Sequence, residues 1–284
     1  MDDAAVLAAL GFPYAPLLGS GGEACVYSLG STRVLRVMRP GARFSDAQAK
    51  ARLLKAIKSN ARHLDFLTPE VLAIHKIGKR IAVIEPTLPG VPVSKMLEIV
   101  SGLERVRLIQ NYLDAAASIF SIVLPANGFG PLTGDDALRR GSWRDYAKTR
   151  ILRSAGHCPE DLRAAVLAQA DSPLDEPSKP ALVHLDYFPA NVLAEGERIT
   201  AVLDFGASSV IGDARFELWS AVAYLDAEIS PAATDADRQQ ALSWLAERGL
   251  YNGFSSAKRW LAAYWSLAAD DAALMAWCRR ILLT

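Results

Sequence analysis

Apolar positions in the first third of the chain fall in short runs of β-forming residues that glycines interrupt. Gly19-Ser20-Gly21-Gly22 and Gly30-Ser31 separate the first three runs, and strands joined by such short turns pair antiparallel. A helical pattern over 46–57, with Ser45 as its N-cap, lies between the third and fourth runs. We therefore predict strands at 14–18, 24–29, 33–38, 71–76 and 80–84.

Beyond residue 92 the apolar spacing becomes mainly helical. The exceptions are three short strand-like runs at 182–185, 192–194 and 199–203. A short helix is also expected at the start of the chain, over 2–10. The remaining predicted helices are 93–100, 103–124, 143–155, 160–170, 214–228, 234–248, 255–269 and 270–282.

A proline-rich segment divides these two patterns. Residues 85–92 contain three prolines and predict a stiff connector. Residues 1–90 carry 12 Lys/Arg against 7 Asp/Glu, and residues 91–284 carry 19 against 24. We expect an α+β protein with a β-rich N-terminal domain, 1–90, and a mainly helical C-terminal domain, 91–284.

Composition excludes several classes of protein. The 284 residues are 51% hydrophobic and 22% charged, which excludes a disordered chain, and zero net charge argues against nucleic-acid binding. Cys25, Cys158 and Cys278 are too few and too scattered for a disulfide framework. The acidic Met1-Asp2-Asp3 start predicts no signal peptide, and the uncharged stretch 115–134 contains prolines and glycines that argue against a membrane span. A cytoplasmic protein is expected; the sequence specifies no oligomeric state.

The glycine cluster at 19–22 is the first candidate for chemistry. Its backbone can approach phosphates closely because no Cβ blocks it. In a dinucleotide-binding fold the cluster would open a helix, but β-forming residues follow it here. It therefore fits a nucleotide-covering lid between two strands, or a plain hairpin turn.

Polar residues at two strand–loop junctions are the second candidate. Asp186 and Asn191 lie five residues apart after one predicted strand, and Asp204 follows the wholly apolar 201–203. Placing a carboxylate directly after a buried strand costs stability unless something binds it. Two oxygen ligands and a nearby carboxylate base suit Mg²⁺-assisted phosphoryl transfer. Taken singly, each residue also fits an ordinary turn.

With these motifs in order, the sequence resembles the aminoglycoside phosphotransferase and choline kinase branch of the protein-kinase-like fold. The resemblance runs from the hairpin at Gly19 to the helix at Arg215, and it includes the long helical segment before His184. It implies a two-lobe fold with a β-rich N-lobe and a helical C-lobe. It also implies an ATP-dependent kinase of small-molecule hydroxyl groups, with ATP and Mg²⁺ as cofactors.

The resemblance also implies roles for individual residues. Asp186 matches the catalytic base, and Asn191 and Asp204 match the magnesium ligands. Glu85 and Thr87 match the connector whose backbone pairs with adenine. The phosphates would be positioned by Gly19, Ser20, Gly21, Gly22 and Arg36. We expect His184 to hydrogen-bond backbone and steady the catalytic loop.

Three departures from the family pattern stand out. Leu185 occupies a position where the family usually has glycine. Arg36 stands where a phosphate-binding lysine is expected, and an arginine grips phosphate with a planar fork. Lys50 falls where its glutamate partner should be, and the helix over 46–57 contains no glutamate. The usual ion pair is absent or rebuilt, with Asp46 as one candidate, and Lys50 is either solvated or the mark of a lost partner.

The acceptor remains open at this stage. The resemblance and the acidic C-terminal domain favour an aminoglycoside-type antibiotic, whereas the basic chain end around Arg279 and Arg280 argues against it. Amino alcohols, sugars and homoserine-like acceptors are alternatives. A nucleotide-binding pseudokinase-like module is the second hypothesis, because the usual ion pair is missing. The short linker from Gly206 to Asp213 argues against a protein kinase.

Overall fold

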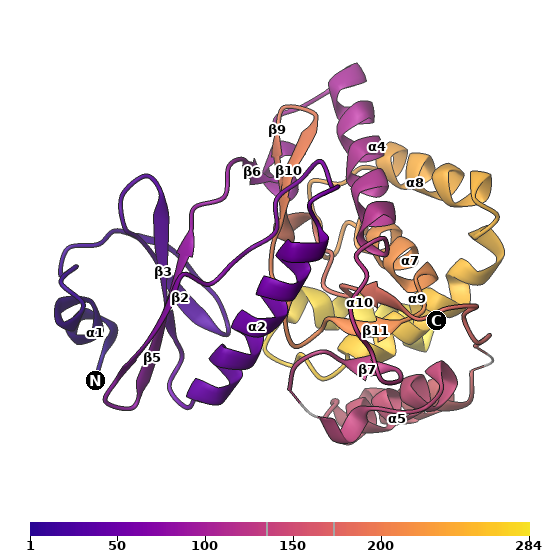
Figure 1. Cartoon of the computed structure of the whole chain (residues 1–284). Coiled ribbons are helices and arrows are strands. Elements are labelled where there is room, and N and C mark those ends of the chain that lie inside the picture. The colour runs from indigo at the N-terminus through magenta and orange to yellow at the C-terminus, as the bar shows by residue number, and fades with distance from the viewer. Residues whose placement is uncertain (135, 173) are drawn as a thin grey trace.

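The computed structural model describes residues 1–134, 136–172 and 174–284 and shows two lobes (Figure 1). The N-lobe is a five-stranded antiparallel sheet in the order β1-β2-β3-β5-β4. Two helices accompany this sheet, and one of them, α2, lies on the side facing the C-lobe. The elements are α1 (Asp3–Ala9), β1 (Leu17–Ser20), β2 (Ala24–Ser28), β3 (Arg33–Met38), α2 (Phe44–Asn60), β4 (Ala73–Ile77) and β5 (Arg80–Pro86).

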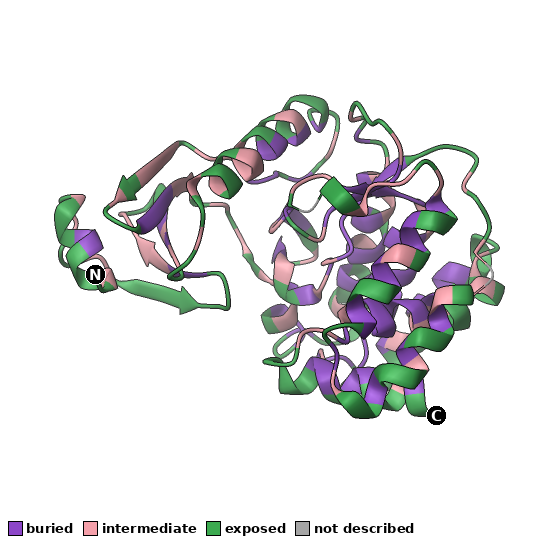
Figure 2. Ribbon diagram, turned by 90° about the horizontal axis from the view of Figure 1, so that it is seen from below, coloured by how far each residue is buried: buried purple, intermediate pink, exposed green. Residues whose placement is uncertain are grey.

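The sheet and α1 enclose a small apolar core of their own. Alternate residues of β3, Leu35 and Val37, point to the same side, as the period of a strand requires. They pack with Ala82 of β5 and with Val6 and Leu7 of α1. Most of the remaining N-lobe surface is exposed, as Figure 2 shows. The N-lobe therefore relies on few buried side chains.

Helix α2 contributes to a different core. Its buried stripe, Leu53, Leu54 and Ile57, belongs to the large apolar cluster of the C-lobe. The chain after α2 also reaches the C-lobe, because the Leu67 amide donates to the Thr200 carbonyl at 2.8 Å. The position of α2 against the sheet is thus coupled to the C-lobe.

The C-lobe is mainly helical and includes two small three-stranded sheets, β10-β9-β6 and β7-β11-β8. Trp143 lies at the centre of its core, with the rings of Phe216 and Trp260 at 5.2 and 5.9 Å. Its longer helices are α4 (Gly102–Ile119), α5 (Trp143–Ala155), α7 (Arg215–Ala223), α8 (Asp235–Glu247), α9 (Tyr251–Trp265) and α10 (Ala272–Leu283), with short helices α3 (Val93–Met96) and α6 (Arg163–Ala168). Its strands are β6 (Val91–Pro92), β7 (Gly130–Pro131), β8 (Ala181–Val183), β9 (Val192–Glu195), β10 (Arg198–Val202) and β11 (Val210–Gly212), and single 3₁₀ turns are η1 (Asp136–Leu138), η2 (Glu160–Leu162), η3 (Gln169–Asp171) and η4 (Pro189–Asn191).

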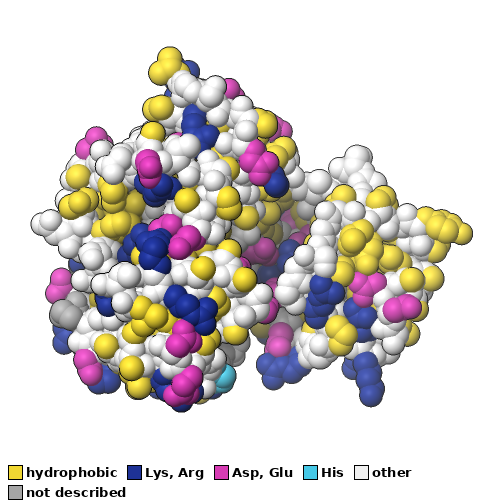
Figure 3. All heavy atoms as spheres, turned by 180° about the vertical axis from the view of Figure 1, so that it is seen from behind, with side chains coloured by type: hydrophobic (Ala, Val, Ile, Leu, Met, Phe, Trp, Pro, Cys, Tyr) yellow, Lys and Arg dark blue, Asp and Glu magenta, His cyan; other side chains and the backbone are white. Residues whose placement is uncertain are grey.

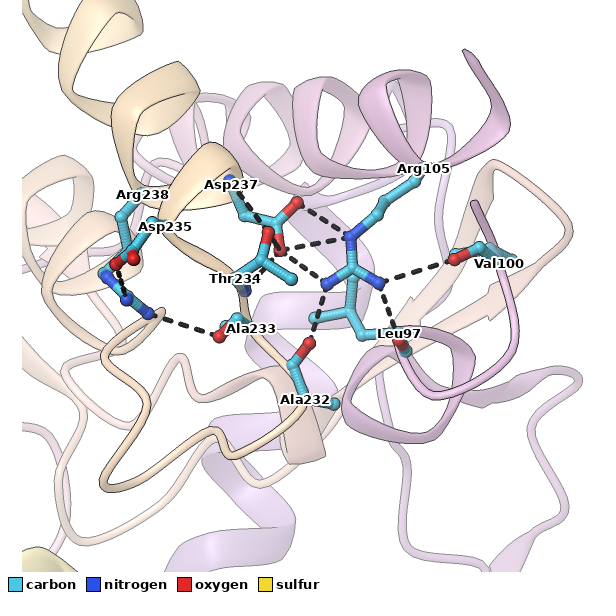
Figure 4. A network of polar contacts seen from close by, with 9 residues as sticks. All are labelled: Leu97, Val100, Arg105, Ala232, Ala233, Thr234, Asp235, Asp237 and Arg238. Atoms are coloured by element: carbon cyan, nitrogen blue, oxygen red, sulfur yellow. Dashed lines mark hydrogen bonds and ion pairs between the residues drawn. The ribbon is translucent and has the colours of Figure 1, made fainter. Parts of the chain in front are cut away.

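One arginine joins three segments of this lobe (Figure 4). Arg105 of α4 donates to the buried carboxylate of Asp237, and it also donates to the Leu97 carbonyl at 2.7 Å and the Ala232 carbonyl at 2.6 Å. The same carboxylate of Asp237 completes the capping box of Thr234 at the start of α8. The pair therefore fixes α8 against α4.

The surface carries no large field of one sign on the face seen in Figure 3, where acidic and basic side chains are interspersed. Among the described residues, no helix combines the length and the apolar character that crossing a bilayer requires.

The structure corrects several predicted boundaries. The first strand is 17–20 and not 14–18, and Tyr14 is 94% exposed. Helix α2 begins at Phe44, so the predicted cap at Ser45 was wrong. The expected helix 255–269 begins four residues earlier, at Tyr251. The division into domains at residue 90 remains our proposal.

Candidate active site

A cleft of about 1290 Å³ lies between the lobes. In the view of Figure 3 the two lobes appear as separate masses with a notch between them. Every site residue expected from the sequence lines this cleft, although the expectations come from segments far apart in the chain. These residues are Gly19, Ser20, Gly21, Gly22, Arg36, Glu85, Thr87, Asp186, Asn191 and Asp204.

The catalytic loop begins directly after β8 and is held by His184. The Nδ1 atom of this buried imidazole accepts from the Asp186 amide at 3.1 Å, so its proton lies on Nε2, which donates to the Leu203 carbonyl at 2.6 Å. Burial lowers the pKa of His184 to about 4. A neutral imidazole thus links the Asp186 loop to the segment before Asp204, as expected. It donates a hydrogen bond but does not act as a general acid.

Glu217 supports the same loop and was not expected from the sequence. Its carboxylate, buried on α7, accepts from the His184 amide, and burial raises its pKa to about 8. The only sequence signal was an acidic residue within the apolar run Phe216-Glu217-Leu218. A charged residue inside a buried helix indicates that its side chain has a polar partner within the fold.

Two residues of the site adopt backbone conformations that favour glycine. Leu185 has φ 61° and Asp204 has φ 55°. The Leu185 carbonyl accepts from the buried Tyr224 hydroxyl at 2.8 Å, which holds the loop in this conformation. The left-handed backbone explains the family's usual glycine at the position of Leu185.

Asp186 is the candidate base. Burial raises the pKa of Asp186 to about 8, and the negative charges of Asp204 and Glu23 act in the same direction. Asn191 donates from Nδ2 to the Asp186 carbonyl at 2.9 Å, which leaves its side-chain oxygen free to bind a cation. Leu203 donates its amide to the Asn191 carbonyl at 2.7 Å and so draws the two loops together.

Asp204 faces two cations from the N-lobe. Its Oδ1 lies 3.3 Å from Arg36 NH1 and 3.6 Å from Lys50 Nζ. Lys50 Nζ also lies 3.7 Å from Glu23 at the end of the lid. Burial alone would raise the pKa of Asp204, but Arg36 and Lys50 outweigh it, and the pKa lies below its ordinary value.

The ion pair missing from the sequence pattern is replaced by a different one, because β3 keeps a cation, Arg36, and α2 carries a second cation where the acid was expected. The cation, Lys50, is on the helix, and the acid, Glu23, is on the lid. The expectation that Asp46 replaces the glutamate is wrong, because Asp46 pairs with Arg43 at 2.8 Å.

The lid glycines leave unfilled space. A Cβ on Gly19 would meet no atom within 4 Å, and one on Gly21 or Gly22 would make only ordinary contact at 4.0 or 3.9 Å. Neither crowding nor positive φ within the protein requires glycine here. Arg39 anchors the lid by donating to Ser20 Oγ at 2.6 Å and to the Gly21 carbonyl at 2.9 Å. An anchored lid in which three of the four residues are glycines fits a bound phosphate group.

The connector lies at the rear of the cleft. Glu85 pairs with Val34 across the sheet, and burial raises the pKa of Glu85 although Arg36 opposes this shift. The Thr87 amide donates to the Thr32 carbonyl at 2.9 Å. Leu88 lines the cleft beside them. Adenine pairing through the Thr87 amide would have to break the bond to Thr32, so the Thr87 role remains a prediction.

The donor set fits magnesium. Asp204 and Asn191 present carboxylate and amide oxygens, the hard ligands that Mg²⁺ prefers together with phosphate oxygens. Within the described ranges, no three or more His, Cys, Asp or Glu side chains form a metal cluster. The cations beside Asp204 show that this carboxylate attracts positive charge.

Comparison with known proteins gives the class. A sequence model described as the phosphotransferase enzyme family matches residues 15–254, so the chain belongs to this family. The expected enzyme class, a phosphotransferase with an alcohol group as acceptor, is thereby confirmed. A search of curated protein sequences found no match.

Solved structures confirm the protein-kinase-like fold. A macrolide 2′-phosphotransferase from Brachybacterium faecium is 21% identical, with coverage of 98% of this chain and 97% of that chain and a TM-score of 0.56. The gentamicin complex of APH(2″)-IIa is 16% identical, with coverage of 100% and 97% and a TM-score of 0.67. The aminoglycoside phosphotransferase APH(3″)-Id from Streptomyces rimosus, in complex with ADP and streptomycin, is 15% identical, with coverage of 94% and 99% and a TM-score of 0.57.

Proposed function

We propose that this phosphotransferase is an ATP- and Mg²⁺-dependent kinase that transfers the γ-phosphoryl group to a hydroxyl of a small molecule. The observation that carries the proposal is the convergence of Asp186, Asn191 and Asp204 in one cleft, beneath a lid of bare glycines and beside two cations. The complexes of APH structures with ATP, ADP or GDP support nucleotide use.

In this proposal Asp186 orients the acceptor hydroxyl and takes its proton as the oxygen attacks the γ-phosphorus. The bond to the β–γ bridging oxygen breaks, and ADP leaves. Asp204 and Asn191 would hold Mg²⁺, which neutralises phosphate charge when bound. Arg36 and Lys50 turn from Asp204 towards the phosphates. Most of the rate enhancement comes from positioning and charge stabilisation.

The acceptor is a separate question. The similar structures contain gentamicin or streptomycin, or carry a macrolide name, which supports an antibiotic hydroxyl as one candidate. A polycationic aminoglycoside needs carboxylates beyond the catalytic ones. Among the described acidic residues of the C-terminal helices, Asp271 lines the cleft, whereas Asp226 is paired with Lys258 and Arg280.

We also place the protein in the cytoplasm. Cys25, Cys158 and Cys278 are all free and buried, which suits a reducing compartment.

The decisive experiment is turnover of Mg·ATP with a panel of acceptors, for the native chain and for Asp186→Asn. This variant should keep ATP affinity within a few-fold and lose about 10²-fold or more in turnover, the scale of a lost general base. Asp161→Asn, a surface carboxylate paired with Arg279, is the control. Near-normal turnover of Asp186→Asn would remove Asp186 from its role. Tight Mg·ATP binding without turnover for any acceptor would favour the pseudokinase-like module.

A further inference from the structure

The cleft that Asp186 lines also reaches helices of the C-lobe. Arg150 of α5 and Tyr264 and Trp265 of α9 line it there. The Arg150 guanidinium lies 3.8 Å from the centre of the Tyr264 ring. Burial raises the pKa of the Tyr264 hydroxyl, Arg150 lowers it, and the negative charge of Asp186 adds to the rise. Arg150 and Asp186 therefore line the same cleft.

Arg150 is buried without a neutralising partner. Its side chain donates to Ser154 Oγ at 2.6 Å and to the Tyr264 carbonyl at 3.0 Å, and both acceptors are uncharged. Within the described chain, no carboxylate lies within ion-pair distance of it and its Nε makes no hydrogen bond. Arg80 is buried to the same degree, 7% exposed against 8% for Arg150, but it has the Asp3 carboxylate at 2.6 Å.

A buried charge without a counter-charge is costly, because burial removes its hydration and neutral acceptors replace only part of it. An arginine in a ligand cleft has a planar fork that matches carboxylate and phosphate oxygens. The burial, the missing counter-charge and the place in the cleft all point to an anionic ligand group.

We infer that Arg150 binds an anionic group of the acceptor, a carboxylate or a phosphate, while Tyr264 and Trp265 bound the acceptor's carbon skeleton. The acceptor is then a hydroxylated acid and not a polyamine. This inference rests on the proposed kinase function, because the acceptor hydroxyl must reach Asp186.

Anion probes test the site without knowledge of the acceptor. The full-length protein is saturated with Mg·ADP, so that the nucleotide-phosphate site is filled. Malonate and inorganic phosphate are then titrated at constant ionic strength, and the melting temperature is followed. At least one probe should raise the melting temperature of the native chain and of Arg153→Met, an exposed arginine on the same helix, and should leave Arg150→Met unchanged.

The probe that acts identifies the anion as a carboxylate or a phosphate. The inference would be overturned if neither probe raised the melting temperature of the native chain, or if all three proteins showed equal increases. If Arg150→Met fails to fold, Arg150→Lys takes its place. The lysine keeps the charge but loses the fork, so its shift should be smaller than that of the native chain, and an equal shift counts against the inference.

Turnover provides the second test. D-glycerate and L-homoserine are compared with choline and kanamycin as acceptors. Arg150→Met should raise the KM of an accepted acid at least tenfold and change kcat little. If the protein phosphorylates choline or kanamycin and Arg150→Met does not change this activity, the inference about Arg150 is overturned but the kinase function stands. Failure of the native chain to bind Mg·ATP would instead overturn the kinase function. If all four acceptors are inert, the anion titration decides.

Discussion

Lys50 occupies the position at which the family pattern leads one to expect a glutamate, and its surroundings define its role. It is mostly covered, with 22% of its side chain exposed, and it contacts acids from the lid and from the C-lobe. A solvated lysine is therefore excluded. Together with Arg36 it places two positive charges beside Asp204. In the proposed kinase, these charges would meet the phosphates as a fork and a point charge.

Lys50→Glu should impair nucleotide binding. The new carboxylate would stand next to Glu23 and Asp204, so like charges would repel each other and the phosphates. We expect the KM for Mg·ATP to rise about tenfold or more, because one charge-assisted contact is lost and repulsion is added. Lys50→Met should have a smaller effect in the same direction.

The control for this prediction is Lys55→Glu, an exposed lysine on the same helix. Calorimetric titration with ATP and with adenosine separates phosphate binding from misfolding, because adenosine lacks phosphates. An improvement on Lys50→Glu would instead identify Lys50 as the remnant of a lost pair.

Leu185 presents two opposing effects. Its φ of 61° costs about 1–2 kcal/mol for a residue with a side chain, and glycine would remove that cost. Its side chain is wholly buried, however, and truncating a buried leucine costs about 2–5 kcal/mol. Packing outweighs strain, which explains how this chain tolerates leucine.

Truncation of Leu185 should therefore destabilise the fold, but the alanine and glycine variants should not follow their usual order of stability. Leu185→Ala keeps the strain and loses the packing, whereas Leu185→Gly loses both. We expect Leu185→Gly to be at least as stable as Leu185→Ala in urea unfolding, although glycine is normally less stable than alanine by about 0.5–1 kcal/mol. The normal order would show that the loop relaxes out of the left-handed conformation.

Among the elements, the connector before β6 is tightly constrained at Gly90. Gly90 has φ 105°, and a Cβ there would lie 2.4 Å from Thr200 Oγ and 2.9 Å from the Ala194 carbonyl. Thr200 in turn donates to the Pro89 carbonyl at 2.6 Å. Backbone strain and close approach both require glycine where the chain enters the C-lobe.

Gly90→Ala should destabilise the protein by about 2–4 kcal/mol, because a clash with backbone adds to the cost of the positive φ. Gly41→Ala is a matched control, since Gly41 has φ 95° with no atom within 4 Å of its Cβ position. It should lose only the strain, about 1–2 kcal/mol. Equal losses in chemical unfolding would mean that the surroundings of Gly90 yield easily.

The elements also show what the sequence could predict. The amphipathic helix α10 was placed to within two residues, because its apolar period is sustained. Helix α4 was placed to within one residue at its start, but it ends at Ile119, five residues before the predicted end. The strands β6, β7 and β11 have two or three residues, too few for any period, and were missed. The contacts of Lys50 with Glu23 and Asp204 could not be predicted, because residues 23, 50 and 204 meet only through the tertiary fold.

At the scale of the whole molecule, the two lobes share one electrostatic site. Glu23 on the lid helps to raise the pKa of Asp186 in the C-lobe. A base acts when it is deprotonated, so activity should fall as the pH drops through the pKa of Asp186. Burial raises that pKa to about 8, and Lys50 opposes the rise.

Glu23→Gln should shift the acid limb of kcat/KM to lower pH. It removes one negative charge near Asp186 and releases Lys50, and both changes favour the ionised base. Glu195→Gln, at an exposed pair with Arg198, should leave the profile unchanged. A shift to higher pH would mean that another group controls the limb.

The distribution of aromatic residues between the lobes has an optical consequence. All six tryptophans lie beyond residue 142, in the C-lobe, and Trp265 lines the cleft. Intrinsic tryptophan emission is therefore blind to the N-lobe. Unfolding of the N-lobe sheet alone would change far-ultraviolet circular dichroism before it changed fluorescence. The two signals can therefore follow the unfolding of each lobe separately. An acceptor that reaches Trp265 should report its own arrival by quenching, without a label.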